Sequence, residues 1–336
     1  MQKRNATVDV AKYIAALLVV GIHTSLFSDV NETLYFVVVH IICRTAVPFF
    51  AICTGYYIGC RLEGFAQRRQ DVSFKDLLLP QWKRVIKLYM IWTCLYLLFS
   101  IPFWIETGWF SLMAFVDFSL AALTSGSHYH LWYLLYLIYA MPLMYLLVKW
   151  IPDKHQPWLI AVLWIWAVIN YTYKTLLPEV VRSVAAPLGR FSLLPILPTL
   201  LLLGVYISGE KRKPIRAYLI GFSASFVLLS VEAFMLKKMG IVAVSYIVFT
   251  LPTMYFLFHI ILEVRLPISP ERAGFLGAIS TFVYCVHPMF IETMGRKIES
   301  SVLTYLFVAV SATMAASLFV IIKRCLQGKK DRSCFN

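Results

Sequence analysis

Charged residues are scarce in this sequence: Asp, Glu, Lys and Arg make up only 14% of the 336 residues, whereas 60% are hydrophobic. A soluble domain of this length needs more charge to cover its surface. Apolar runs of about 20 residues recur along the whole chain, which is typical of helices that cross a membrane. The composition therefore excludes a soluble globular protein and predicts an all-α, polytopic integral membrane bundle.

Several motifs are also absent. The chain contains no G-x-x-x-x-G-K-[ST] and no G-x-G-x-x-G stretch, so nucleotide hydrolysis and dinucleotide binding are not supported. The seven cysteines form no C-x-x-C pair and most lie in apolar segments, so we expect reduced thiols and neither disulfides nor a metal site. No small-x-small cleavage site follows the first apolar segment, so we interpret that segment as a retained helix and not as a signal peptide.

Apolar runs bounded by polar residues predict about ten membrane-spanning helices. They cover approximately residues 8–28, 35–59, 85–105, 130–150, 157–174, 188–208, 216–236, 241–263, 274–294 and 300–322. The apolar stretch at 108–126 is interrupted by Asp117, so we interpret it as an interfacial or re-entrant helix. Without a linker or an internal repeat, one transmembrane domain is expected over 1–323. A polar cytoplasmic tail follows at 324–336, and its end, "GKKDRSCFN", is expected to be disordered.

The distribution of basic residues predicts the orientation of the helices. With both termini in the cytoplasm, 23 of the 31 Lys and Arg residues lie on the cytoplasmic side and 7 on the outer side. Basic residues collect in short cytoplasmic loops, so this bias favours an even number of helices with both ends inside. It also accounts for the net charge of +14 without nucleic acid as a partner. The partner expected from composition is the lipid bilayer.

Ionisable side chains within a span are costly and usually face the bundle interior or a wet cavity. Lys12 and His23 are eleven residues apart, which places them on one face of the first helix at opposite depths. Asp9 joins this face one turn before Lys12. Such a stripe suits a channel through the bilayer, although hydrogen bonding between packed helices remains the alternative.

The second span contains Arg44 and Pro48. A guanidinium group does not lose its proton, so at this depth it must find an anion, a carbonyl group or water. Pro48 frees a backbone carbonyl, and Gly55 and Gly59 allow the close approach of another helix. We therefore expect Arg44 to have a functional role.

The stretch "SHYHLWYLLY" (127–136) places His128, His130, Trp132 and Tyr133 near an outer interface. An aromatic belt and a site for an acceptor substrate both fit this composition. No second group of ligands accompanies His130, so the sequence predicts no metal here.

In "FVYCVHPMFIE" (282–292), His287 precedes Pro288, and Glu292 follows. Proline weakens the helix at this point and opens a local pocket. His287 is either a site residue or a donor that bridges two helices.

Three basic residues, Lys83, Arg84 and Lys87, lie at the start of the third span. The general preference for positive charge in the cytoplasm accounts for them. They would also form a patch that binds the phosphates of an anionic cytoplasmic ligand.

These segments resemble a known family. "VDVAKYIAALLVVGIH", "CRTAVPFFAICTGYY", "KRVIKLYMIW", "HYHLWYLLYLIYAMPL" and "VYCVHPMFI" have the order and spacing of the bacterial acyltransferase family 3 membrane proteins. The short ten-span inner-membrane O-acetyltransferases, such as the one that modifies enterobacterial common antigen, are the most similar subgroup. The membrane half of the vancomycin-resistance serine racemases resembles the same fold.

The chain departs from the family pattern at three places. The first-span motif is an arginine, ten residues and a histidine; here His23 matches, but Lys12 replaces the arginine, which keeps the charge and loses the bidentate fork. The second-span "SGY" is "TGY" at 54–56. The paired basic motif of the third span maps onto Arg84 and Lys87, again with one lysine in place of an arginine.

The resemblance implies an O-acyltransferase of the bacterial inner membrane. Such an enzyme takes an acyl group, usually acetyl, from cytoplasmic acyl-CoA and passes it to a hydroxyl group of a surface glycan or lipid-linked sugar. Acetyl-CoA is then a co-substrate, and no permanently bound cofactor is expected. The implied catalytic residues are His23 as general base or transient acyl carrier, Arg44 as oxyanion stabiliser or carboxylate anchor, and Lys12. Coenzyme A would be bound by Lys12, Lys83, Arg84 and Lys87, and the acceptor by His130, Trp132, Tyr133, His287 and Glu292.

Two other functions fit the same features. A carrier for a serine-like amino acid or a glycan also needs charged residues at membrane depth and helices broken by proline. A glycan-binding or scaffold subunit that has lost catalysis is compatible with the two Lys-for-Arg replacements. His23 and the basic cytoplasmic rim favour the enzyme, because a serine carrier needs neither. The sequence leaves the oligomeric state open, a homo-oligomer included.

Overall fold

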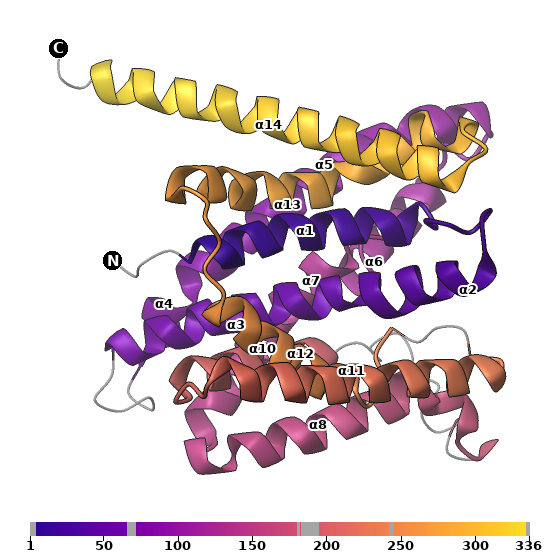
Figure 1. Ribbon diagram of the computed structural model, residues 1–336. Helices are drawn as coiled ribbons and strands as arrows, with labels where there is room; N and C mark the ends of the chain where they lie inside the picture. Colours follow the sequence, from indigo (N-terminus) through magenta and orange to yellow (C-terminus); the bar gives the residue numbers. More distant parts are fainter. Residues whose placement is uncertain (1–4, 66–71, 180–181, 183–194, 242–244, 334–336) are drawn as a thin grey trace.

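The structure is a computed structural model that describes residues 5–65, 72–179, 182, 195–241 and 245–333. These residues contain helices and no β-strand, and the long helices lie side by side along one common direction (Figure 1). Within these ranges, seven helices are long and apolar enough to cross a membrane. They are α1 (Ala6–His23), the segment Glu32–Glu63, α5 (Leu79–Glu106), α7 (Trp132–Trp150), α11 (Ile215–Lys238), α13 (Pro270–Thr293) and α14 (Ser301–Ser333). The predicted helical membrane protein is confirmed.

Three of the predicted spans correspond to shorter helices. The spans expected at 157–174, 188–208 and 241–263 contain α8 (Gln156–Tyr171), α10 (Ile196–Gly209) and α12 (Thr250–Glu263), which have 16, 14 and 14 residues. Residues 188–194 and 242–244 lie outside the described residues. The expected number of ten spans and the side of the membrane that holds the termini therefore stay predictions.

The remaining elements are short. The stretch predicted as an interfacial or re-entrant helix contains α6 (Leu112–Thr124). Single turns are α2 (Glu32–Tyr35), α4 (Phe74–Leu77), η4 (Asp153–His155), η5 (Tyr173–Leu176) and η7 (Gly295–Lys297).

The first described helix begins and the last described helix ends at the same end of the bundle (Figure 1). Helix α14 is described as far as Ser333, and the polar tail expected at 324–336 stays a prediction.

The outward faces of α5, α11 and α14 are apolar. Leu98, Ile220 and Met314 lie on these three helices and are 63%, 71% and 67% exposed. Apolar faces of this kind are stable against lipid chains and unfavourable in water.

Helices α3 (Ala46–Phe65) and α10 pack at very short range because glycines face the partner backbone. A Cβ atom on Gly55 would lie 2.0 Å from the carbonyl oxygen of Leu201, and one on Gly204 would lie 2.1 Å from that of Ile52. Gly59 faces Ser208 in the same way. The close helix approach predicted at Gly55 and Gly59 is confirmed, and it follows the small-residue rule of membrane helices.

The backbone of the second span changes its winding just before Pro48. It begins with α2, widens into a π-helix, η1 (Phe36–Ile42), tightens into a 3₁₀ turn, η2 (Cys43–Thr45), and then continues as α3. Pro48 has no N–H group to offer the carbonyl of Arg44, which favours an irregular turn at this point. Arg44 therefore lies on an irregular turn between two regular segments.

Candidate functional site

Two cavities lie inside the helix bundle. The first, which we call the His23 cavity, has a volume of about 280 Å³ and is lined by His23, Arg44, His130, Trp132, Tyr246 and Tyr284, among other residues. The second, the Lys12 cavity, has a volume of about 410 Å³ and is lined by Lys12, Tyr57, Gln81, Arg84, Tyr133 and Tyr284, among others. Tyr284 of α13 lines both cavities, so the two cavities are neighbours at this residue.

Helix α1 contributes to both cavities. Lys12 and His23 stand on one face of this helix, roughly 16 Å apart along its axis. Lys12 lines one cavity and His23 the other. The stripe predicted from the eleven-residue spacing therefore connects two internal spaces.

The Lys12 ammonium group is held by two neighbours. Its Nζ atom lies 3.3 Å from Oδ1 of Asp9, whose side chain is 2% exposed, and 4.7 Å from the ring centre of Tyr57. A carboxylate and an aromatic face both stabilise an ammonium group away from bulk water. Arg84 reaches the same cavity from α5, so two cations border it.

Four histidine rings form a row beside the His23 cavity. The ring of His23 stacks on that of His287 with centroids 5.3 Å apart. His287 contacts His130 at 5.4 Å, and His130 contacts His128 at 5.1 Å. The row joins the end of α1 (His23), the last two turns of α13 (His287) and the loop before α7 (His128 and His130).

Pro288 fixes the protonation pattern of the preceding His287. Because proline has no N–H group, the carbonyl of Tyr284, four residues earlier, loses its usual helical donor. The side chain of His287 replaces it: Nδ1 lies 2.8 Å from the Tyr284 oxygen and 3.3 Å from the Val283 oxygen. A carbonyl oxygen only accepts, so Nδ1 carries the proton and Nε2 has a free lone pair. This Nε2 atom is buried and has no partner among the described residues.

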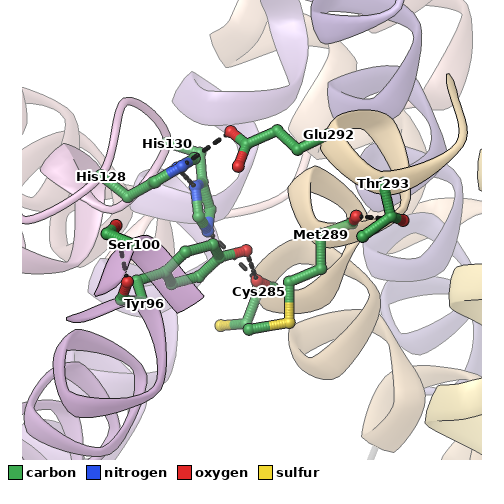
Figure 2. A network of polar contacts seen from close by, with 8 residues as sticks. All are labelled: Tyr96, Ser100, His128, His130, Cys285, Met289, Glu292 and Thr293. Carbon is green, nitrogen blue, oxygen red and sulfur yellow. Dashed lines mark hydrogen bonds and ion pairs between the residues drawn. The ribbon is translucent and has the colours of Figure 1, made fainter. Parts of the chain in front are cut away.

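The other end of the row is a hydrogen-bonded chain that ends at a carboxylate (Figure 2). His130 Nε2 lies 3.2 Å from the carbonyl oxygen of Cys285, so this nitrogen donates and a neutral His130 accepts at Nδ1. His128 Nδ1, at 3.1 Å, must then be the donor. The second nitrogen of His128 lies 2.9 Å from Oε1 of Glu292. Between them, His128 and Glu292 therefore hold one shared proton, either as an ion pair or as a neutral pair.

Tyr96 and Tyr284 hold this chain in place. The ring of Tyr96 stacks on His128 with centroids 4.2 Å apart, and its hydroxyl group donates to the Cys285 carbonyl at 2.9 Å (Figure 2). The hydroxyl group of Tyr284 donates to the carbonyl oxygen of His130. These two donors fix the loop before α7 against α13, so the histidines have little freedom to move.

The ring of His23 is placed differently. Its neighbours are the rings of His287 and Tyr129, the latter at 4.9 Å, and among the described residues it has no hydrogen-bond partner. A histidine in a cavity without a competing hydrogen bond can accept a proton from a bound ligand.

The predicted site residues separate into four groups. His23, Arg44, His130 and Trp132 line the His23 cavity, whereas Lys12, Arg84 and Tyr133 line the Lys12 cavity. His287 is fully buried between His23 and His130, and Glu292 pairs with His128. Lys83 and Lys87 are exposed on α5 and are not among the residues that line the Lys12 cavity.

Tyr96, Tyr129 and Tyr284 were not among the residues predicted for the site, and His128 was predicted only as part of the 127–136 stretch. The spacing His-x-His at 128–130 was visible, but its partners lie in α5 and α13. A tyrosine in an apolar span gives no signal of its own, because aromatic residues are common there.

The described residues contain no group of three or more His, Cys, Asp or Glu side chains placed to hold a metal ion. All six cysteines among them are free thiols.

Taken together, a helical bundle with apolar outer faces and a histidine cluster beside an internal cavity defines a membrane-embedded protein with an internal polar site. Comparison with known families shows which one: an acyltransferase domain matches residues 5–322, so the chain belongs to the acyltransferase 3 family of membrane acyltransferases.

Individual relatives are distant. An amino-acid racemase of Enterococcus faecalis is 24% identical over 97% of this chain, and a serine/alanine racemase of Enterococcus gallinarum is 26% identical over 94% of it. Each match covers 46% of the relative, so the chain spans a little under half the length of these curated relatives. No solved structure matches the chain.

Proposed function

We propose that this protein is an O-acyltransferase of the bacterial inner membrane that transfers an acetyl group from acetyl-CoA to a hydroxyl group of a glycan or lipid-linked sugar. The observation that supports the proposal is a pair of cavities. Residues of α1 line both of them, and so does Tyr284. One cavity is bordered by two cations and the other by a histidine without a hydrogen-bond partner among the described residues. A polyanionic donor and a neutral hydroxyl group need these two environments.

The Lys12 cavity suits the donor. Coenzyme A carries phosphate groups, which bind to Arg and Lys through charge-assisted hydrogen bonds. Lys12 and Arg84 border this cavity, while Lys83 and Lys87 add positive charge to the exposed face of the same helix, α5. The long pantetheine arm would extend past Tyr284 and bring the thioester to the His23 cavity.

The chemical step is an acyl transfer with His23 as general base. The imidazole takes the proton of the acceptor hydroxyl group, and the oxygen attacks the thioester carbonyl carbon. The tetrahedral intermediate collapses with cleavage of the carbon–sulfur bond. Coenzyme A leaves as a thiolate and regains a proton, which His23 can return. The acceptor is then an ester, and the imidazole is neutral again.

The acceptor would lie among His130, Trp132 and Arg44 in the His23 cavity. Trp132 offers an aromatic face, on which the apolar face of a sugar ring packs. His287 and Glu292 would support the acceptor site indirectly. His287 stacks on His23, and Glu292 contacts His128, which contacts His130.

The test uses purified protein in lipid vesicles with radiolabelled acetyl-CoA and lipid-linked sugars. Label should appear in the sugar with the wild-type protein and fall at least a hundredfold with His23→Ala, because removal of a general base costs about 10²- to 10⁴-fold. Full transfer by His23→Ala would contradict the proposal.

A carrier for a serine-like amino acid is the second candidate. It is favoured by the unpartnered Arg44 Nε atom in the His23 cavity and by the names of the two relatives. The same vesicles discriminate between the candidates: uptake of labelled serine without label transfer to any sugar would support the carrier.

A further inference from the structure

Arg44 is a cation without a counter-ion among the residues that the structure describes. Its side chain lines the His23 cavity, and its Nε atom is buried with no hydrogen-bond partner. None of the described residues that line this cavity is Asp or Glu. Among the described residues, no ion pair or hydrogen bond involves the Arg44 guanidinium group. Among the described residues, therefore, no side chain neutralises the permanent positive charge that Arg44 places in the His23 cavity.

Arg44 is partly buried, and an unpaired guanidinium group at membrane depth has a high energetic cost. Arginine does not lose its proton in proteins, so it cannot escape the cost of burial by becoming neutral. The usual solution is a carboxylate or phosphate group that accepts two parallel N–H hydrogen bonds. Here the described side chains offer hydroxyl groups, from Tyr246 and Ser245, and no anion.

The backbone around Arg44 is irregular. The π-helix η1, the 3₁₀ turn η2 and Pro48 interrupt the regular winding at this residue. A change from π to 3₁₀ winding within four residues costs regular hydrogen bonds, and such interruptions are frequent at functional sites. An arginine that served only to join helices would not need this irregular turn.

We propose that Arg44 is the binding site for an anionic group of the acceptor, a carboxylate or a phosphate, which anchors the acceptor while its hydroxyl group faces His23. The inference rests on the proposed function and narrows its substrate class to acidic acceptors, such as a uronic acid or a sugar phosphate. The cavity volume of about 280 Å³ limits the bound part to a group of about one sugar unit.

The test measures binding without acyl transfer. Purified wild-type protein is titrated with glucuronate, glucose 1-phosphate and glucose, three ligands with the same ring and different charge, and the dissociation constant is measured by calorimetry. At least one anion should bind more tightly than glucose. Arg44→Gln should raise the dissociation constant of that anion about tenfold to a hundredfold, the usual loss for a hydrogen bond to a charged group. The dissociation constant of glucose should not change. Arg44→Lys, which keeps the charge, should retain part of the preference.

The two anions distinguish which group Arg44 binds. Tighter binding of glucuronate indicates a carboxylate, and tighter binding of glucose 1-phosphate indicates a phosphate. Equal binding of glucose and both anions, or unchanged anion binding in folded Arg44→Gln, would overturn the inference. The monodispersity of each variant on gel filtration verifies folding, and Arg44→Lys serves as the reference if Arg44→Gln is unstable.

The outcome is separable from that of the proposed function. Anion binding that depends on Arg44, without transfer of label from acetyl-CoA, would retain the inference and reject the transferase. Transfer of label to neutral glucosides, with equal rates for Arg44→Gln and wild type, would retain the transferase and reject the inference.

Discussion

Nε2 of His128 and Oε1 of Glu292 lie 2.9 Å apart, and this contact ties the loop before α7 to the end of α13 across 164 residues of sequence (Figure 2). The side chains are 14% and 18% exposed, so solvent screens them only in part. The pair completes the histidine row that begins at His23, and it holds the second nitrogen of His128, whose Nδ1 donates to His130. It therefore has consequences for stability and for the shape of the site.

The first prediction concerns this pair. His128→Ala and Glu292→Ala should each lower the free energy of unfolding in detergent by about 1–3 kcal/mol, because each leaves a largely buried polar partner unpaired. The double variant should lose less than the sum, with a coupling energy of about 1–2 kcal/mol. Equilibrium denaturation of all four proteins measures this cycle.

A matched control exists on the surface. Glu32 and Lys237 form an ion pair at 2.8 Å, but Glu32 is 82% exposed. Its double-mutant cycle should give a coupling energy close to zero. Equal coupling in the two cycles would contradict the importance assigned to the His128–Glu292 pair.

The second prediction concerns the contact between His287 and the Tyr284 carbonyl. His287→Leu removes the donor that replaces the missing N–H group of Pro288, and it should lower the free energy of unfolding by about 1–3 kcal/mol. Pro288→Ala supplies a backbone N–H group to the same carbonyl. The double variant should therefore be more stable than His287→Leu alone, although it should not regain acyl transfer, because the Nε2 atom is still absent.

Thermal unfolding and the transfer assay separate the two effects. Equal melting temperatures of His287→Leu and the double variant would show that the Tyr284 carbonyl does not depend on His287.

The third prediction concerns the donor cavity. Arg84→Gln should raise the KM for acetyl-CoA about tenfold or more and change kcat little, since a phosphate contact made equally in ground and transition states affects binding alone. Lys154→Gln is the control, because Lys154 is an exposed residue of η4 between α7 and α8. Steady-state kinetics in detergent measures both. A fall in kcat with unchanged KM would place Arg84 in the chemical step and not in donor binding.

The fourth prediction is a pH dependence at the start of α14. Asp29 accepts hydrogen bonds from the backbone N–H and the hydroxyl group of Ser301, and the hydroxyl contact holds the pKa of this exposed carboxyl below its usual range. A carboxyl with a lowered pKa stabilises the fold above about pH 4, and this contribution is lost as the pH falls through the folded-state pKa. Asp29→Asn should therefore lower the melting temperature at pH 7, with a difference from wild type that shrinks below about pH 4.

Asp117→Asn serves as its control, because Asp117 is exposed on α6. Its melting temperature should differ from that of the wild type by the same small amount at every pH. A pH-independent difference for Asp29→Asn as well would contradict the role of its charge.

Much of the helical arrangement follows from patterns that lie within single segments. Apolar runs located the spans around α1, α5, α7, α11, α13 and α14, and the glycines at 55 and 59 indicated a close helix contact. The number of spans does not follow in the same way. The described parts of α10 and α12 have 14 residues each, fewer than the roughly 20 that a span needs, and an apolar run does not reveal where its helical part begins.

The candidate site also has some features that a single segment predicts and others that it does not. The positions of Lys12 and His23 on one face of α1 follow from helical periodicity, and Pro48 marks the irregular turn that carries Arg44. The contact of His128 with Glu292 and the double role of Tyr284 depend on how distant helices pack. Their geometry is set by tertiary contacts between α5, α7 and α13, on which a single sequence carries no information.

The central claim is that His23 is the base of an acyl transfer between the two cavities. The most direct measurement is the rate of acetyl transfer from labelled acetyl-CoA to a lipid-linked sugar by purified protein in vesicles, compared for wild type, His23→Asn and His155→Asn. His155 is exposed in η4 and does not belong to the histidine row, so its variant controls for the loss of a histidine. We predict wild-type rates for His155→Asn and a loss of at least a hundredfold for His23→Asn. Equal rates in all three proteins would contradict the account.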